Sequence, residues 1–347
     1  MNNVRVAIWG FGAMGRGMAE MLVKKKGVEI ISVCDKNPAI VGKDMYEILN
    51  VPQGDRPSVK ISSEISEVVK EGAVDVALLA TDSFTKNAFD KIKYCLEQKV
   101  NVISTAEEMA YPKVQSKDLA EQMDKIAKEN GVTVLGTGIN PGFVLDYLIL
   151  ALTGTCETVE AIKAARINDL SPFGHAVMEE QGVGISVEEF EKREAEGTLA
   201  GHVGFPESIH MIADGMGIPV EEVKQSKTPI VSNTYRETPY VKVEEGSLAG
   251  IRQQGFGYVD GKVMIEMDHP QQVNPQVEDV STGDYIWIKG TPDISLQITP
   301  EIPGGIGTYA MVVNMIPHVI NSEAGLKTML DLPVPRAIMG DMRDFIK

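Results

Sequence analysis

The feature of the sequence that most constrains its fold is the stretch VRVAIWGFGAMGRGMAEML, from Val4 to Leu22. A β-branched and apolar run leads into a turn that carries Gly10, Gly12 and Gly15, and a helical pattern follows. In a dinucleotide-binding turn the first glycine permits the tight bend, the second admits a pyrophosphate, and the third permits close helix–strand packing. The free N–H groups at the start of the helix then face the phosphates. The stretch therefore predicts a strand, a phosphate-binding turn and a helix.

A second strand pattern, VEIISVCD, ends at Asp35, about twenty residues after the last glycine, where an acid binds the adenosine ribose hydroxyls. We therefore predict NAD or NADP as cofactor. Lys36 follows the acid and suits the 2′-phosphate of NADP, so the choice between the two stays open. A turn without any ligand is the alternative interpretation. The residues predicted to bind the cofactor here are Gly10, Phe11, Gly12, Ala13, Met14, Gly15 and Asp35.

Strand and helix patterns alternate with short connections up to about residue 150, which predicts a Rossmann-type, doubly wound parallel sheet in an α/β fold. Strands are expected at 4–9, 28–34, 58–62, 74–80, 100–104 and 132–136, and helices at 14–25, 64–70, 84–98, 116–129 and 142–152. Ligands bind beyond the carboxyl ends of such strands. Three stretches lie there: residues 81–82, 104–108 and 136–142.

The character of the sequence changes after about residue 152. A helix-rich stretch at 175–223 precedes a series of strand patterns, which predicts a second α/β domain built on an open mixed sheet. Within it, Asp260 and Gly261 stand between alternating residues, the signal for a type I′ hairpin.

A helical period returns at the C-terminal end of the chain. One stripe of this helix contains Ala310, Val313, Asn314 and Pro317, and we expect the helix to pack back on the nucleotide-binding domain. The expected organisation is a dinucleotide-binding domain at 1–150, a substrate and dimerisation domain at 151–305, and a C-terminal helical return at 306–347.

Charge and cysteine usage exclude several classes of protein. The net charge of −16 is spread along the chain, which disfavours nucleic acid and anionic membranes as partners. No apolar run approaches the length of about 18 residues that a membrane span needs. Cys34, Cys95 and Cys156 are far apart and the histidines show no metal-ligand spacing, so we expect a reduced, cytoplasmic protein without a metal. The first strand begins almost at once, which leaves no room for a signal peptide.

The stretch STAEEMAYP, residues 104–112, brings a pair of carboxylates to a strand end. Glu107 or Glu108 there suits a general acid or base beside the nicotinamide. The alternative is that both acids only stabilise the first turn of a short helix. Adjacent helical residues point about 100° apart, so at most one of the two is expected to face the site.

Two other strand ends offer cofactor contacts. Thr81 and Asp82 follow one strand, and GTGINPGFVLDYL, residues 136–148, follows another. In the second stretch Asn140 and exposed amides are expected to line the nicotinamide, and Pro141 is well placed to start a helix. A plain strand–helix connection is the alternative.

Candidate substrate contacts lie in the second domain. ARINDLSPFGH, residues 165–175, contains Arg166 and Asn168, and arginine is the preferred side chain for bidentate carboxylate binding. A surface pair of Arg166 with Asp169 is the alternative. His202, between two glycines, is another candidate, although a histidine in such a position is more often structural than catalytic.

Five segments together resemble a known family: WGFGAMGRGMAEML, STAEEMAYP, GTGINPGFVLDYL, RINDLSPFG and GGIGTYA. They are similar to the native amine dehydrogenases that include 2,4-diaminopentanoate dehydrogenase and are related to dihydrodipicolinate reductase. The resemblance spans essentially the whole chain. It implies a homodimer, a place in ornithine degradation, and oxidative deamination of 2,4-diaminopentanoate at C4 to 2-amino-4-oxopentanoate and ammonia, with NAD or NADP reduced.

The resemblance also implies roles for particular residues. A glutamate after the fifth strand is the acid/base, and its position maps to Glu108, where homoserine dehydrogenases have the lysine of a TANK-like sequence. Apart from the resemblance, our own candidates for holding the carboxylate and C2 amine of the substrate are Arg166, Asn168 and His202, and Thr308 in GGIGTYA is a further candidate for substrate binding.

Two other functions remain open at this point. One is a related reductase of a cyclic imine or an aldehyde, although the lysine of homoserine dehydrogenase and the His-His-x-x-Lys segment of dihydrodipicolinate reductase are both absent. The other is a redox sensor that binds a dinucleotide without chemistry. The sequence has no basic helix for contacting DNA, which disfavours a sensor that acts as a repressor.

Overall fold

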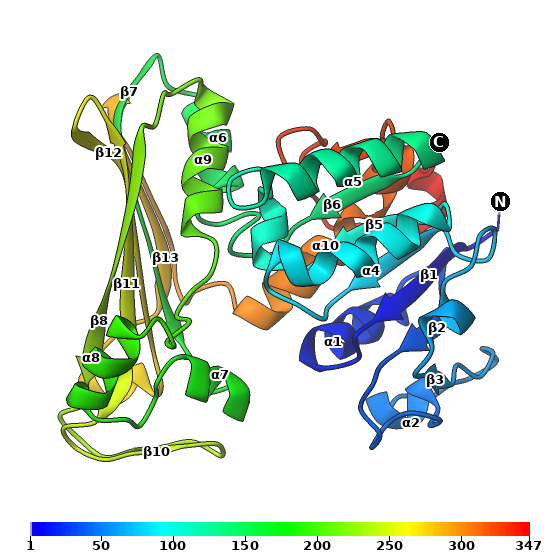
Figure 1. The fold of residues 1–347 in the computed structure, drawn as a ribbon, viewed down its shortest axis with the longest axis horizontal. Coiled ribbons are helices and arrows are strands. Elements are labelled where there is room, and N and C mark those ends of the chain that lie inside the picture. The colour runs from blue at the N-terminus through cyan, green and yellow to red at the C-terminus, as the bar shows by residue number, and fades with distance from the viewer. Residues whose placement is uncertain (1) are drawn as a thin grey trace. The chain divides into compact units, whose positions relative to one another are not determined.

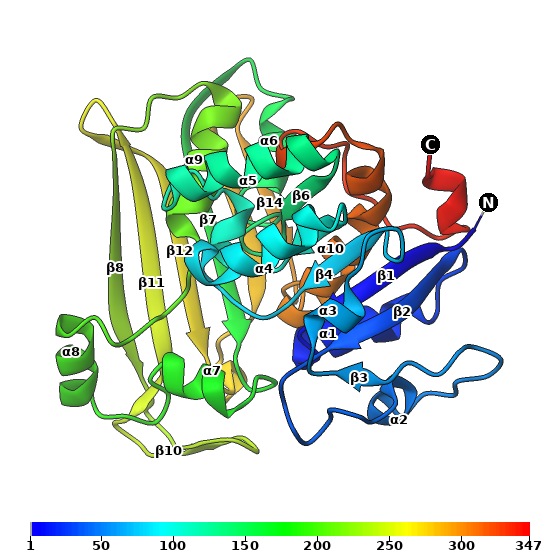
Figure 2. The same ribbon diagram turned by 45° about the vertical axis from the view of Figure 1, so that its right-hand side comes forward.

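The computed structural model describes residues 2–347, which divide into two compact units. The first unit consists of the chain up to Phe143 together with Gly304–Lys347, and the second is Val144–Pro303. Figures 1 and 2 show the elements of each unit.

The first unit is built on a seven-stranded sheet in the order β15-β6-β5-β4-β1-β2-β3, with every neighbouring pair parallel. Its inner strands are apolar on both faces, and β4 is buried along its whole length. The doubly wound sheet predicted from the sequence is confirmed. The strands are β1 Val4–Trp9, β2 Val28–Cys34, β3 Ile61–Ser62, β4 Val76–Leu79, β5 Asn101–Ser104, β6 Thr133–Gly136 and β15 Gly325–Lys327.

Helices cover this sheet in two packed pairs, α1 with α10 and α4 with α5 (Figure 1). α10 also packs against β4, β5 and β6, and the ring of Tyr309 occupies the space that Gly17 leaves on α1. The helices are α1 Ala13–Leu22, α2 Met45–Leu49, α3 Ile65–Val68, α4 Thr85–Glu97, α5 Lys117–Asn130 and α10 Gly304–Asn321, with 3₁₀ turns η1 Glu107–Ala110 and η3 Met342–Phe345.

One helix begins later than the sequence predicts. We expected it at 142–152 with Pro141 at its start, but α6 spans Tyr147–Thr153. Gly142 has φ +122°, outside the helical region, and a Cβ there would lie 2.5 Å from the Gly138 nitrogen. The chain therefore makes an irregular turn first, and the helix begins where the Asp146 carboxylate accepts the Tyr147 N–H at 2.6 Å.

The second unit is built on a six-stranded sheet in the order β14-β13-β7-β12-β11-β8. β12 pairs with β7 in parallel and the other neighbours are antiparallel, so the predicted open mixed sheet is confirmed. The predicted hairpin joins β11 to β12, with φ +48° at Asp260 and +70° at Gly261. The strands are β7 Thr158–Asp169, β8 Glu222–Val231, β11 Leu248–Val259, β12 Lys262–Gln272, β13 Gly283–Thr291 and β14 Ile294–Ile298, beside a small ribbon of β9 Arg236–Glu237 and β10 Lys242–Val243.

The helices of the second unit gather toward one face of its sheet. α9, Phe205–Met216, packs on β8 and β11, and α6 packs on α9 (Figure 1). α8, Val187–Ala195, lies against β8, and α7, His175–Glu180, and the 3₁₀ turn η2, Pro275–Glu278, complete the unit. None of the helices within residues 2–347 is both long enough and apolar enough to cross a membrane.

Candidate functional site

The glycine turn between β1 and α1 has the geometry of a phosphate cradle. Gly10 has φ +94°, and a Cβ there would lie 2.5 Å from the Ala80 carbonyl oxygen. A Cβ on Gly15 would lie 1.9 Å from the Gly10 oxygen, so helix and turn are in direct contact. At Gly12, by contrast, a Cβ would meet nothing within 4 Å. This open space lies at the N-cap of α1, where a pyrophosphate meets free N–H groups. The described residues fit a dinucleotide.

Asp35 is aimed at the same turn. One of its carboxylate oxygens accepts the N–H of Phe11 at 2.5 Å, and the other accepts the N–H of Asn37 at 2.8 Å. The acid is thereby held at the carboxyl end of β2, where ribose hydroxyls bind in this fold. Lys36 is exposed beside it.

The connection after β4 carries Thr81 and Asp82. The Thr81 hydroxyl donates to the Asp82 carboxylate, which also forms an ion pair with Lys91 at 2.5 Å. Both residues lie at the predicted strand end, and cofactor contact by them stays a prediction.

Glu108 makes a contact that its sequence position does not reveal. α4 begins after Phe84, whose side chain has no oxygen that could accept a hydrogen bond from the first N–H groups of the helix. The carboxylate of Glu108 accepts the Thr85 N–H there instead, at 2.8 Å. The Glu108 N–H in turn donates to the Ser83 carbonyl at 3.1 Å. The Glu108 side chain is therefore held against the start of α4.

The loop that carries both glutamates is pressed against β6. A Cβ on Gly136 would lie 2.0 Å from the Met109 carbonyl oxygen, so only glycine admits the η1 turn at this distance. Glu107 begins η1 and is half-buried. The strand end therefore presents Glu107 from a turn that is fixed on two sides.

Residues 136–142 meet the start of α10 within the first unit. The Ile139 N–H donates to the Thr308 hydroxyl at 3.3 Å, and a Cβ on Gly307 would lie 2.8 Å from the Ile139 side chain. Asn140 is half-buried and Pro141 buried beside this contact. The structure thus brings together two stretches that were predicted separately, the loop of residues 136–142 for cofactor contact and Thr308 for substrate contact.

A row of polar side chains crosses the sheet of the second unit. Strand register places Asp284 of β13 opposite Arg166 of β7, and Gln253 of β11 opposite both His269 of β12 and Lys227 of β8. The first four are 0–3% exposed. Buried polar groups are costly unless they are paired, so a row of this length makes this part of the sheet a candidate binding site.

Arg166 is anchored at one end of this row. Its guanidinium pairs with Asp284 at 2.5 Å and donates to the Ile302 carbonyl at 2.6 Å. The pair is buried and involves Asp284, not the surface pair with Asp169 that we considered. Substrate binding by Arg166 stays a prediction. Asn168 lies two residues further along β7, and its Oδ1 is buried and without a hydrogen-bond partner. Substrate binding by Asn168 also stays a prediction.

His202 and His269 form an edge-to-face pair with ring centroids 4.9 Å apart. His269 Nδ1 lies 2.6 Å from the Arg166 carbonyl oxygen, which fixes this nitrogen as the donor. Burial, and then the charge of Arg166, lowers the pKa of His202 to about 3. Burial likewise holds the pKa of His269 well below its usual value. Both rings are neutral near pH 7 and act as hydrogen-bonding groups.

Sequence reasoning set His269 aside and did not single out Gln253 or Asp284. A signal for the first two was present, because the predicted hairpin at Asp260 and Gly261 brings β11 and β12 into register. Asp284 required the order of strands in the sheet. Within residues 2–347 no group of three or more His, Cys, Asp or Glu side chains is arranged to hold a metal ion.

Comparison with known proteins agrees with this geometry. Residues 4–132 match the family described as dihydrodipicolinate reductase, N-terminus, and residues 143–347 match the 2,4-diaminopentanoate dehydrogenase C-terminal domain. Over its full length the chain is 57% identical to 2,4-diaminopentanoate dehydrogenase of Acetoanaerobium sticklandii, covering 98% of that protein.

Two amine dehydrogenases are more distant relatives. The protein from Streptomyces virginiae is 24% identical over 96% of this chain and 98% of its own. The solved structure of the enzyme from Mycobacterium smegmatis superposes with a TM-score of 0.87 at 25% identity, covering 98% of each chain.

The glycine turn, Asp35 and these relatives define the class: an NAD(P)-dependent oxidoreductase that acts on a CH–NH₂ group by oxidative deamination. Within that class, the chain belongs to the 2,4-diaminopentanoate dehydrogenase family. The family, the fold and the use of NAD or NADP are as the sequence predicts.

Proposed function

We propose that this enzyme oxidises 2,4-diaminopentanoate at C4, giving 2-amino-4-oxopentanoate and ammonia. The assignment of the substrate rests on the 57% identity, over the full chain, to a 2,4-diaminopentanoate dehydrogenase. Two buried polar side chains of β7, Arg166 and Asn168, support it, because a diamino acid presents a carboxylate and two amines that need polar partners.

The reaction requires a base before any hydride is transferred. The C4 ammonium loses a proton to a carboxylate, because a cation resists further loss of electron density as its carbon becomes an iminium. When bound at the glycine turn, the nicotinamide cofactor would supply the acceptor for the C4 hydride. Water then adds to the iminium carbon as the carboxylate accepts its proton, and ammonia leaves as the C4 carbonyl forms. In sum, the substrate ammonium, NAD(P)⁺ and water give the ketone, ammonium, NAD(P)H and one proton.

We assign the base to Glu107 in preference to Glu108, to which sequence position alone maps it. Glu108 is held by the start of α4, where its carboxylate replaces the cap that Phe84 lacks. A base has to turn toward the substrate to accept and return a proton, and Glu108 could do so only by giving up its bond to the Thr85 N–H. Glu107, one residue earlier on the same 3₁₀ turn, points about 120° away from its neighbour, because such a turn has about three residues.

Recognition of the amino acid end is assigned to Arg166, Asn168 and His202, with Thr308 near the nicotinamide. The neutral His202 ring suits a hydrogen bond to the C2 amine or the carboxylate. The unpartnered Oδ1 of Asn168 is an acceptor for an ammonium. The Arg166 guanidinium has further N–H groups for the substrate carboxylate besides those bound to Asp284 and Ile302.

An assay in the reductive direction separates the candidate functions. With 2-amino-4-oxopentanoate present, oxidation of NADH or NADPH should require ammonia. Oxidation of the cofactor with a cyclic imine or an aldehyde, but not with ammonia and the keto acid, would favour the related reductase. Binding of the cofactor without turnover of any of these compounds would favour the sensor.

We also propose that the enzyme is a homodimer formed through the second unit. In support, the sheet face opposite α9 carries Trp287, 39% exposed and stacked on Tyr285, and Val263, 40% exposed. Exposed aromatic side chains of this kind are enriched at protein interfaces. Sedimentation of the wild type should give a dimer and that of Trp287→Glu a monomer; a wild-type monomer would refute the proposal.

A cytoplasmic location is proposed on the cysteine chemistry. Cys34 and Cys95 are buried free thiols, and Cys156 is also unpaired within the described chain. Free thiols persist in a reducing compartment.

A further inference from the structure

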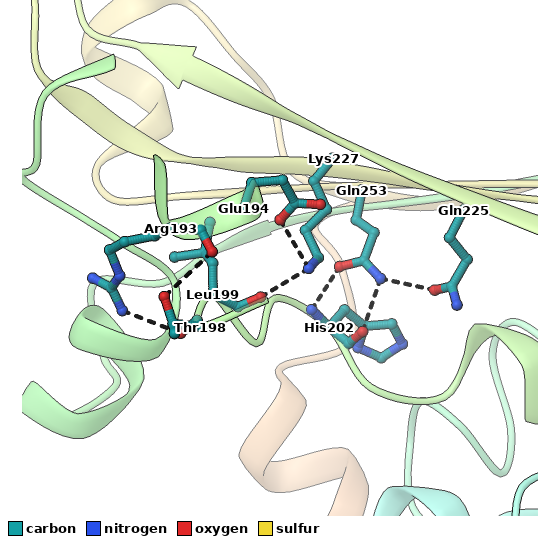
Figure 3. Close-up of polar contacts among 8 residues, drawn as sticks. All are labelled: Arg193, Glu194, Thr198, Leu199, His202, Gln225, Lys227 and Gln253. Atoms are coloured by element: carbon teal, nitrogen blue, oxygen red, sulfur yellow. Dashed lines mark hydrogen bonds and ion pairs between the residues drawn. The ribbon is translucent and has the colours of Figure 1, made fainter. Parts of the chain in front are cut away.

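His202 lies on an irregular segment that is held by side chains of the sheet. The segment joins α8, which ends at Ala195, to α9, which begins at Phe205. The chain turns sharply within it, with φ +64° at Gly201 and +124° at Gly204. Figure 3 shows the side chains of β8 and β11 that contact this segment.

Gln253 of β11 binds the main chain of His202 on both sides. Its Oε1 accepts the His202 N–H at 2.8 Å, and its Nε2 donates to the His202 carbonyl at 2.9 Å (Figure 3). These two bonds fix the direction of the amide, because a main-chain N–H can only donate and a carbonyl can only accept; the same Nε2 also donates to the Gln225 side-chain oxygen at 3.0 Å. Gln253 is 3% exposed, so these bonds do not compete with water.

Two further features hold the segment between α8 and α9 close to the Gln253 side-chain amide. Lys227 of β8 donates to the Leu199 carbonyl at 2.8 Å and pairs with Glu194 at 3.1 Å. A Cβ on Gly201 would lie 2.4 Å from the Gln253 Oε1, so the absence of a side chain there permits the approach.

The imidazole of His202 is placed by these contacts. Its ring packs edge-to-face on Phe205, at 5.0 Å between centroids, and on His269. With the main chain fixed on both sides of its Cα, the ring has few orientations that preserve both packing contacts. A shift of the His202 backbone would move the ring relative to His269 and Arg166.

We propose that Gln253 is a positioning residue for substrate recognition, which acts by fixing the backbone, and through it the ring, of His202. The inference rests on the proposed function, in which His202 binds the amino acid end of the substrate. Gln253 itself does not touch the substrate, because its amide is occupied by His202 and Gln225. Its role is to keep the His202 ring where a hydrogen bond to the substrate is possible.

The test uses Gln253→Met, which fills nearly the same volume without any hydrogen bond. The matched control is Gln254→Met, because Gln254 is adjacent on β11 and points to the opposite face of the sheet. Gln253→Met should raise KM for 2,4-diaminopentanoate about tenfold, as expected for a misplaced hydrogen bond. kcat and the KM for the cofactor should change less than about twofold, and the control should match the wild type in all three values.

A double-mutant cycle shows whether Gln253 acts through His202. His202→Ala should raise the same KM, and Gln253→Met should add nothing further in the His202→Ala background. Equal effects of Gln253→Met in both backgrounds, or no effect on KM in either, would overturn the positioning role. If His202→Ala itself leaves KM unchanged, it is the proposed role of His202 that fails.

A measurement that does not depend on turnover distinguishes failure of the positioning role of Gln253 from failure of the proposed role of His202. In proteins with isotope-labelled histidine, the NMR signals of the His202 ring should shift or broaden in Gln253→Met and stay in place in Gln254→Met. Unmoved ring signals in a folded Gln253→Met variant would overturn the inference even if the enzyme acts on a different amine.

Discussion

At the scale of single residues, two adjacent glutamates have different surroundings. Glu108 completes α4 from outside the helix, through its bond to the Thr85 N–H, while Glu107 stands at the first position of η1. Glu107 and Glu108 are adjacent in the sequence, but their side chains therefore have different hydrogen-bonding surroundings. The two residues form a matched set for mutation.

Glu107→Gln is expected to lower kcat by about 10²–10⁴-fold, because it removes general acid/base catalysis. Glu108→Gln should retain most activity, since the amide oxygen of glutamine still accepts the Thr85 N–H. Steady-state kinetics on both variants, with fluorescence titration of NADH to show intact cofactor binding, make the comparison. The reverse ranking would return the catalytic role to Glu108.

Glu108→Ala tests the structural contact separately. Loss of the carboxylate leaves the start of α4 without an acceptor and should cost about 0.5–2 kcal/mol of unfolding free energy. Urea denaturation of Glu108→Ala beside Glu107→Ala provides the measurement. Equal losses in the two variants would contradict a special contact at Glu108.

The buried histidines predict a dependence of stability on pH. The pKa of His202 is lowered to about 3 in the folded protein, from about 6.5 when unfolded, so below pH 6.5 the unfolded state binds more protons. Stability is complete above pH 6.5 and falls as the pH decreases. Between pH 7 and 5.5 the wild type should lose about 1 kcal/mol more unfolding free energy than His202→Gln. Parallel pH profiles of the two proteins would show that His202 titrates normally.

At the scale of elements, the glycine turn and the end of β2 act together, because Asp35 accepts the Phe11 N–H of the turn. A carboxylate at this position binds ribose hydroxyls and repels a 2′-phosphate. Lys36 beside it is exposed and not part of that contact. From this contact we predict a preference for NAD over NADP.

Asp35→Ser should shift the ratio of kcat/KM for NAD to that for NADP by about tenfold or more toward NADP, because one repulsive charge is removed. Lys36→Ser, the adjacent control, should shift the ratio the other way or leave it unchanged. A ratio that does not respond to Asp35→Ser would show that the acid does not face the ribose.

The elements also show what the sequence could reveal and what it could not. The first parallel strands and the hairpin at Asp260 were predictable because alternation, buried runs and turn residues are local signals. The late start of α6 was not, because it depends on the approach of Gly142 to Gly138. The contact of Glu108 with α4 was also hidden, since it needs the loop after β5 to lie beside the loop after β4.

At the scale of the whole molecule, the two units contribute different chemistry. The first holds the dinucleotide turn, the two glutamates and Thr308, and the second holds the polar row that includes Arg166 and His269. If the proposed assignments hold, the residues for hydride transfer and those for substrate recognition lie in separate stretches of chain. The amino-acid composition does not reveal the polar row, because the row becomes continuous only when β13, β7, β12 and β11 are neighbours in the sheet.

The measurement that tests the central claim most directly follows one hydrogen of the substrate. 2,4-Diaminopentanoate is labelled with deuterium at C4 in one sample and at C2 in another, and the reduced cofactor and the products are analysed by mass spectrometry. We predict that deuterium reaches the cofactor only from C4, with one ammonia and one 2-amino-4-oxopentanoate formed for each NAD(P)H. Transfer from C2, or no cofactor reduction with this substrate, would contradict the account.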